Sequence, residues 1–238
     1  MPVETPVDLS GRSLLVTGAA GGLGSLISRG LAGAGARLTL LGRDEDRLRA
    51  LDVEGAVVTS VDLTTPDGPV RAVRAAVGAH GGLAGVVHAA GVVAFGPLAE
   101  VDDDVVDELF LLNALAPLRL LRAASASLTE AAADSGDAFF LTISGVVAEK
   151  PTAHMAAYSA SKAASWALAS AAAGELRRAR VRVLDARPPH TETGLATRPV
   201  AGTAPRLPQG LQPEQVAARI VTAIAAGERD LPTSAFGP

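Results

Sequence analysis

The sequence of 238 residues contains no cysteine, and aromatic residues make up only 3% of it. The absence of cysteine excludes disulfides, thiolate metal sites and cysteine nucleophiles, and it agrees with the cytoplasmic location that we expect. The formal net charge is −4, and the basic residues form no patch. Because the chain has no basic patch to neutralise phosphates and few aromatic side chains to stack on bases, we expect no binding of nucleic acid. We also expect no metal site.

Long apolar runs are missing too, although 48% of the residues are hydrophobic. No run approaches the roughly 18 uninterrupted apolar residues of a membrane span. The first residues, "MPVETPVDLSGR", lack the basic region and apolar core of a signal peptide. We therefore expect no membrane association, and the length fits one large α/β domain or two small ones.

Short apolar runs alternate with helical stretches along most of the chain. Strands are expected at 13–18, 37–42, 56–63, 85–91, 137–144 and 181–188. Helices are expected at 22–34, 44–51, 65–80, in two segments within 100–128, at 158–178 and at 213–226. This alternation with short connections predicts an α/β fold with a doubly wound parallel sheet, in a single domain over residues 1–238.

Two segments fall outside this alternation. Residues 188–212 are irregular and rich in proline and glycine. Such a long loop in a compact domain is often functional, so we interpret it as a substrate lid, with a plain surface excursion as the alternative. Residues 229–238 are expected to contain at most a short edge strand, because Pro232 has no amide hydrogen to donate to a ladder.

A glycine-rich turn, "VTGAAGGLG" at 16–24, follows the first expected strand and opens the first expected helix. Glycine allows the backbone to come close to a ligand, and the helix N-terminus offers unpaired N–H groups to a phosphate. A glycine cluster alone could be a packing turn. Its position between the first strand and the first helix favours binding of a dinucleotide.

A tyrosine and a lysine lie one helical turn apart in "YSASK" at 158–162. Tyr158 is the only tyrosine of the chain, and Lys162 is one of two lysines. Residues four apart share one helix face, so both side chains can enter the same pocket. A nearby ammonium favours the phenolate and brings a phenol of reference pKa about 10 closer to working pH. Taken alone, the pair could also be an interfacial tyrosine beside a solvated lysine.

The chain resembles the compact, one-domain short-chain dehydrogenase/reductase family. The resemblance runs from about Ser10 to Ala226 and rests on the order and spacing of "TGAAGGLG", "VDL", "HAAG", "LLNALAP" and "YSASK". It implies a Rossmann-like fold and a nicotinamide cofactor. It also implies that Tyr158 is the general acid/base and that Lys162 binds the nicotinamide ribose and lowers the pKa of Tyr158. Asn113 matches the family asparagine that holds a helix irregularity and a water in a proton relay.

The same resemblance assigns the cofactor contacts. These are Thr17, Gly18, Gly22, Leu23, Gly24, Arg43, Asp62, Leu63, Ala89, Ala90, Gly91, Asn113, Tyr158, Lys162, Pro188, Thr191 and Thr193.

The end of the second strand indicates which cofactor is bound. An acid at this place would bind the ribose 2′-hydroxyl and repel a 2′-phosphate. The chain has Gly42 and then Arg43, whose guanidinium can pair with a phosphate. We therefore expect NADP rather than NAD. The alternative is that Arg43 pairs with Asp44 or Asp46, or stacks on adenine.

Three positions depart from the family pattern. Ala89 replaces an asparagine, and Pro189 replaces a glycine after the sixth strand. The serine that orients the substrate carbonyl usually lies thirteen residues before the tyrosine, where this chain has Gly145. Ser144 is one residue earlier, and a small shift of the loop would bring its hydroxyl to that place. We therefore count Ser144 with Asn113, Tyr158 and Lys162 as the catalytic residues, and the competing hypothesis is that this donor is missing.

These patterns predict an NADP-dependent, ketoreductase-like oxidoreductase acting on an apolar carbonyl or alcohol. Two alternatives are a cofactor-binding scaffold with impaired chemistry and a redox-neutral enzyme such as an epimerase or dehydratase. The family resemblance also implies a homodimer or homotetramer.

Overall fold

The apolar runs of the sequence form a parallel β-sheet. The computed structural model describes residues 6–206 and 208–237, and within them the sheet has the order β3-β2-β1-β4-β5-β6, with every neighbouring pair parallel. The strands are β1 (Ser13–Thr17), β2 (Arg37–Gly42), β3 (Val57–Ser60), β4 (Gly85–His88), β5 (Ala138–Ile143) and β6 (Val181–Ala186). All residues of β1, β4 and β6 are buried, as expected for a sheet covered on both faces.

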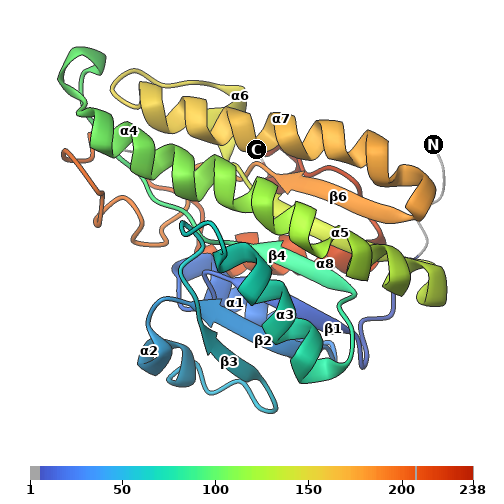
Figure 1. Cartoon of the computed structure of the whole chain (residues 1–238). Helices are drawn as coiled ribbons and strands as arrows, with labels where there is room; N and C mark the ends of the chain where they lie inside the picture. Colours follow the sequence, from blue (N-terminus) through green and yellow to red (C-terminus); the bar gives the residue numbers. More distant parts are fainter. Residues whose placement is uncertain (1–5, 207, 238) are drawn as a thin grey trace.

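Helices cover both faces of the sheet (Figure 1). They are α1 (Gly22–Gly33), α2 (Glu45–Arg49), α3 (Gly68–His80), α4 (Asp103–Phe110), α5 (Ala116–Ser135), α6 (Val146–Glu149), α7 (Ala156–Leu176) and α8 (Pro213–Ala226). Short 3₁₀ turns are η1 (Leu98–Glu100), η3 (Arg177–Ala179) and η4 (Thr233–Phe236), and η2 (Leu111–Leu115) is a π-helix. One apolar core lies between the sheet and α3, α5 and α7, and a second lies between the sheet and α1 and α8. The predicted doubly wound α/β fold is confirmed.

The strand order reverses between β1 and β4. From β1 the chain proceeds through β2 to β3 on one side, and from β4 through β5 to β6 on the other. Thr17 and His88 are register partners at the carboxyl ends of these two central strands. In open α/β sheets, ligands bind in the crevice at this switch point, and the predicted site residues gather around it.

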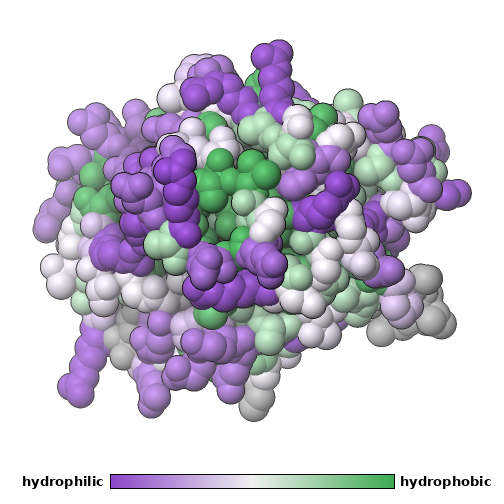
Figure 2. Space-filling view, turned by 90° about the horizontal axis from the view of Figure 1, so that it is seen from below, coloured by the Kyte–Doolittle hydropathy of each residue, from purple (hydrophilic) through white to green (hydrophobic). Residues whose placement is uncertain are grey.

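The continuous helical stretch Asp103–Ser135 is long and apolar enough to cross a membrane by length and composition alone. Its buried residues, however, form part of a core against the sheet, among them Leu120, Leu121 and Leu128. Packing against the sheet therefore explains the buried side of this stretch. Figure 2 shows one face of the molecule, where hydrophobic atoms appear in small groups between hydrophilic side chains.

The C-terminal segment differs from the expected edge strand. Leu231 forms one isolated parallel bridge with Ala186, and the chain then turns into η4. The Arg187 carbonyl, which would accept the next ladder hydrogen bond, accepts from the Thr233 hydroxyl at 2.9 Å, and η4 begins at Thr233, so pairing stops there. The expectation of a short strand in 229–238 is corrected to this single bridge.

Candidate active site

The glycine turn packs so closely that side chains would not fit. Gly18 has φ +65°, and a Cβ there would lie 2.5 Å from the Ala90 nitrogen. A Cβ at Gly24 would lie 2.2 Å from the Gly18 carbonyl oxygen. Gly18 therefore lets β1 turn against the end of β4, and Gly24 lets α1 begin directly above that turn. The first amides of α1 point out of this turn, and its cap residue Gly21 provides no side chain to occupy them.

Thr17, at the end of β1, faces the protein interior. Its side chain is fully buried, and its hydroxyl lies 2.9 Å from Nδ1 of His88. Burial, together with the positive charge of Lys162, lowers the pKa of His88 to about 3, so this imidazole is neutral. Thr17 therefore ties β1 to β4 through its side chain, and its carbonyl also accepts the Ala89 amide, so its predicted contact with the cofactor stays a prediction.

Two arginines lie near the expected adenosine end of the site. Arg43 follows β2 directly and is exposed, and its charge is one of the causes that lower the pKa of Asp62. Arg47, on α2, donates from Nη2 to the carbonyl of Ala20 in the glycine turn, at 3.1 Å. Leu63, next to Asp62, is buried in the core. The sequence analysis did not single out Arg47, although its place one turn into the helix after Arg43 was a usable signal.

The segment after β4 is held by Asn113. Its side chain accepts a hydrogen bond from the Val92 amide at 3.0 Å and donates to the Val92 carbonyl at 2.9 Å and to Ser161 at 3.0 Å. Asn113 lies in the π-helix η2, as expected for the helix irregularity. These bonds hold Val92, which directly follows the Ala89–Gly91 stretch where alanine replaces the family asparagine.

Gly91 brings the predicted catalytic side chains together. A Cβ at this position would lie 3.1 Å from Oδ1 of Asn113 and 3.2 Å from Nζ of Lys162. Any larger residue would press on both groups at once. The absence of a side chain at Gly91 therefore leaves room for the amide and the ammonium at the switch point.

Tyr158 and Lys162 point from α7 toward the same end of the sheet. Tyr158 is 9% exposed and Lys162 is 8% exposed. Lys162 donates from Nζ to the Ile143 carbonyl at 2.9 Å. Burial lowers the pKa of Lys162 to about 8 and raises the pKa of Tyr158 to about 12. The pKa of Tyr158 is therefore raised rather than lowered in the protein alone, and burial is the cause.

Ser144 is engaged away from the expected substrate position. It is 1% exposed, and its hydroxyl donates to Oδ1 of Asp185 on β6. Gly145, at the place of the family serine, has φ +77°, and the nearest atom to a Cβ there is the Pro188 oxygen at 3.8 Å. Ser144 stays a prediction as a substrate contact, and its hydrogen bond to Asp185 favours the competing hypothesis that this donor is missing.

The segment 188–212 returns to the glycine turn. A Cβ at Gly22 would lie 2.7 Å from both Cβ and the carbonyl oxygen of Thr193, so this predicted cofactor residue touches the start of α1. The Pro188 carbonyl accepts from the Val146 amide, which joins the segment to the loop after β5. Thr191 forms an isolated bridge with Leu211 and closes the base of the segment.

The same segment covers Tyr158 with apolar side chains. The buried members of this cluster are Val93, Ala94, Phe95, Leu109, Met155 and Tyr158, and Leu195, Ala196, Val200, Ala201 and Ala204 pack against them from the segment. The Phe95 amide donates to the Ala201 carbonyl at 3.0 Å, and the Val200 amide donates to the Val93 carbonyl at 2.9 Å. The phenol therefore lies in an apolar enclosure whose outer wall is this segment.

Comparison with known proteins agrees with this geometry. Residues 12–202 match the family described as short chain dehydrogenase. The 2,5-dichloro-2,5-cyclohexadiene-1,4-diol dehydrogenase LinX of Sphingobium indicum is 30% identical over 74% of this chain and 71% of its own. The chain spans 52% of the length of one curated relative and 62% of the length of another.

Solved structures share the fold over nearly the whole chain. A metagenomic short-chain oxidoreductase in complex with NADP is 30% identical, with a TM-score of 0.79 over 95% of this chain and 98% of that one. A 3-ketoacyl-(acyl-carrier-protein) reductase from Brucella melitensis, complexed with NADH, has a TM-score of 0.84 at 22% identity, over 94% and 96% of the two chains. The glycine turn at the switch point, the family match and these neighbours lead to one conclusion: the chain belongs to the short-chain dehydrogenase/reductase family of oxidoreductases.

Proposed function

We propose that this protein is an NADP-dependent oxidoreductase that transfers hydride between the nicotinamide and an apolar carbonyl or alcohol. The observation that carries the proposal is the convergence of Asn113 and Lys162 at Gly91, next to the end of β4, with Tyr158 one helical turn before Lys162 on α7. The bound cofactor would supply or accept the hydride. The residues of the chain bind it, orient the substrate and move the proton.

The tight glycine turn and the uncapped start of α1 suit a pyrophosphate, since amides at a helix N-terminus attract anions. Lys162 donates one ammonium hydrogen to the Ile143 carbonyl, and it would hold the nicotinamide ribose with the others. Arg43 and Arg47 provide two positive charges where an adenosine 2′-phosphate would lie, which supports NADP over NAD.

In the reduction, Tyr158 Oη would give its proton to the substrate oxygen, and in the oxidation it would take that proton back. A phenol whose pKa is raised to about 12 by burial is a weak proton donor. The nearby ammonium of Lys162 would assist the transfer, because a positive charge favours the phenolate that forms. The apolar side chains around Tyr158 would exclude water and receive the apolar part of the substrate. The segment 188–212 would act as the lid over this enclosure.

Gly145 favours a second candidate function. If no other group replaces the family serine, the substrate oxygen loses one hydrogen-bond donor. The protein would then bind the cofactor with impaired or redox-neutral chemistry, as a scaffold, epimerase or dehydratase.

We propose a cytoplasmic location and a homodimer or homotetramer in either case. The exposed Leu115 at the end of η2 and the exposed Leu118 in α5 support self-association.

The proposal is tested by following NADPH oxidation with a panel of apolar ketones and aldehydes. Tyr158→Phe keeps the ring and removes the acid, so cofactor binding should persist while turnover falls by about a hundredfold or more. Both candidates bind the cofactor, so titration establishes binding and turnover separates the two functions. Binding without oxidation of any substrate by the unmodified protein would favour the second candidate, and unchanged turnover in Tyr158→Phe would refute Tyr158 as the acid.

A further inference from the structure

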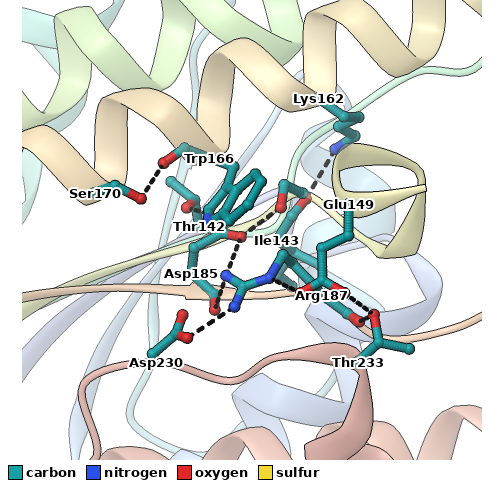
Figure 3. A network of polar contacts seen from close by, with 11 residues as sticks. Thr142, Ile143, Glu149, Lys162, Trp166, Ser170, Asp185, Arg187, Asp230 and Thr233 are labelled. Atoms are coloured by element: carbon teal, nitrogen blue, oxygen red, sulfur yellow. Dashed lines mark hydrogen bonds and ion pairs between the residues drawn. The ribbon is translucent and has the colours of Figure 1, made fainter. Parts of the chain in front are cut away.

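A buried charged cluster lies beside the candidate active site and has no part in the mechanism above (Figure 3). Its centre is Arg187, which pairs with Glu149, with Asp185 at 3.3 Å and with Asp230 at 2.8 Å, and which lies over the Trp166 ring at 4.9 Å from the centroid. Glu149 and Asp230 lie toward the surface. Asp185 differs from them because it is 3% exposed, and it lies at a hollow between β6 and α7 that Arg229 and Asp230 also line.

Asp185 holds the end of β5. It is the register partner of Thr142, and its carboxylate accepts from the Thr142 hydroxyl at 2.5 Å and from the Ser144 hydroxyl. Ile143 lies between these two residues, and its carbonyl oxygen accepts the hydrogen bond from Lys162. The acceptor of the ammonium is therefore flanked on both sides by residues anchored to one carboxylate.

The charges around Lys162 are unevenly distributed. His88 on β4 is neutral because its pKa is about 3, and Tyr158 on α7 is neutral because its pKa is about 12. The negative charge of Asp185 is the one cause that opposes the lowering of the Lys162 pKa by burial. Arg187 lies on the other side of Asp185 and forms an ion pair with the same carboxylate. Arg187 also forms ion pairs with Glu149 and Asp230.

We propose that Asp185 is a positioning residue for the reaction. Its buried carboxylate is the counter-charge that keeps the Lys162 ammonium ionised, and it fixes the end of β5, where the Ile143 carbonyl accepts the hydrogen bond from Lys162. Both groups carry charge between a pH of about 6, where Asp185 titrates, and about 8, where Lys162 titrates. Below this interval Asp185 is protonated, and above it Lys162 loses its proton. The catalytic consequence rests on the function proposed above, whereas the charge pairing does not.

The chain allows a direct measurement because Lys150 and Lys162 are its only lysines. Protein labelled with ¹³C at lysine Cε should give two side-chain resonances, which are followed by NMR against pH. In Asp185→Asn we expect the Lys162 midpoint to fall by about one unit, the lower end of the shift that a nearby opposite charge causes, because the Asp185 charge raises the Lys162 pKa against burial. Lys150 is the internal reference. In the control Asp230→Asn, which removes an exposed carboxylate on the far side of Arg187, the midpoint should stay in place.

A second NMR titration uses the unmodified protein and therefore does not depend on whether Asp185→Asn folds. The Lys162 resonance of the unmodified protein should show an additional inflection near pH 6 as Asp185 is protonated. Ser144→Ala removes a hydrogen bond to the carboxylate, which raises the pKa of Asp185, so this inflection should move to higher pH. A folded Asp185→Asn with an unchanged Lys162 midpoint would overturn the proposal, and so would an inflection that is missing or does not move in Ser144→Ala.

Kinetics then test the catalytic consequence. Once a substrate is known, the alkaline limb of kcat/KM in Asp185→Asn should shift to lower pH together with the Lys162 midpoint. A limb that stays in place while the midpoint moves would show that Asp185 pairs with Lys162 but does not serve the reaction. Failure of the proposed function would leave the NMR result intact.

Discussion

Replacing Gly202 by alanine should release the segment 188–212 from its docking site. Gly202 has φ +71°, and a Cβ there would lie 1.8 Å from the Phe95 carbonyl oxygen, so the two backbones must separate. The separation breaks the bonds from Phe95 to Ala201 and from Val200 to Val93. Each hydrogen bond contributes about 0.5–1.5 kcal/mol net, so closure should weaken by about 1–3 kcal/mol, or roughly 5- to 150-fold.

Hydrogen exchange of the Phe95 and Val200 amides measures this opening, because their protection reports the free energy of the local closed state. Gly55→Ala is the matched control. Gly55 has φ +70°, nearly the same as Gly202, and nothing lies within 4 Å of a Cβ there. Both variants carry the same backbone strain, and only Gly202→Ala should speed exchange of these two amides. Equal exchange in the two variants would refute the idea that this contact holds the segment closed.

The remaining predictions concern the cofactor and the serine. Arg43→Ala should weaken NADPH binding by about ten- to a hundredfold, the worth of one charge-assisted hydrogen bond, and should leave NADH binding nearly unchanged. Titration of both cofactors checks this, with Arg49→Ala on the same exposed surface as control, and equal losses for both cofactors would contradict the assignment of NADP. Ser144→Ala should change turnover less than tenfold, whereas Gly145→Ser should raise it by supplying the missing donor. A large loss in the first variant with no gain in the second would instead show that Ser144 acts on the substrate.

Much of the fold could be predicted because the signals are local. Each buried strand is a short apolar run, and the glycine turn, the irregularity at Asn113 and the pairing of Tyr158 with Lys162 follow from residues close together in the sequence. Strand ends were less predictable. The run expected at 56–63 forms a strand only over Val57–Ser60, where it pairs with β2.

Contacts between distant segments could not be predicted. Ser144 and Asp185 lie 41 residues apart, and only the pairing of β5 with β6 shows that the serine hydroxyl already has a partner. The same holds for Thr17 and His88, 71 residues apart. The pKa of Tyr158 depends on how completely side chains from α7, the segment after β4 and the segment 188–212 enclose the phenol, and that enclosure is a property of the packed molecule.

The stacking of Arg187 on Trp166 has a practical consequence. Trp166 is the only tryptophan of the chain, and it lies one helical turn beyond Lys162. Indole emission responds to nearby charge, so the intrinsic fluorescence of this protein comes from one place, beside the guanidinium that contacts Asp185. Any event that rearranges these charges, such as protonation of the carboxylate or movement of the C-terminal segment at Asp230, should be visible as a change in emission without an added label.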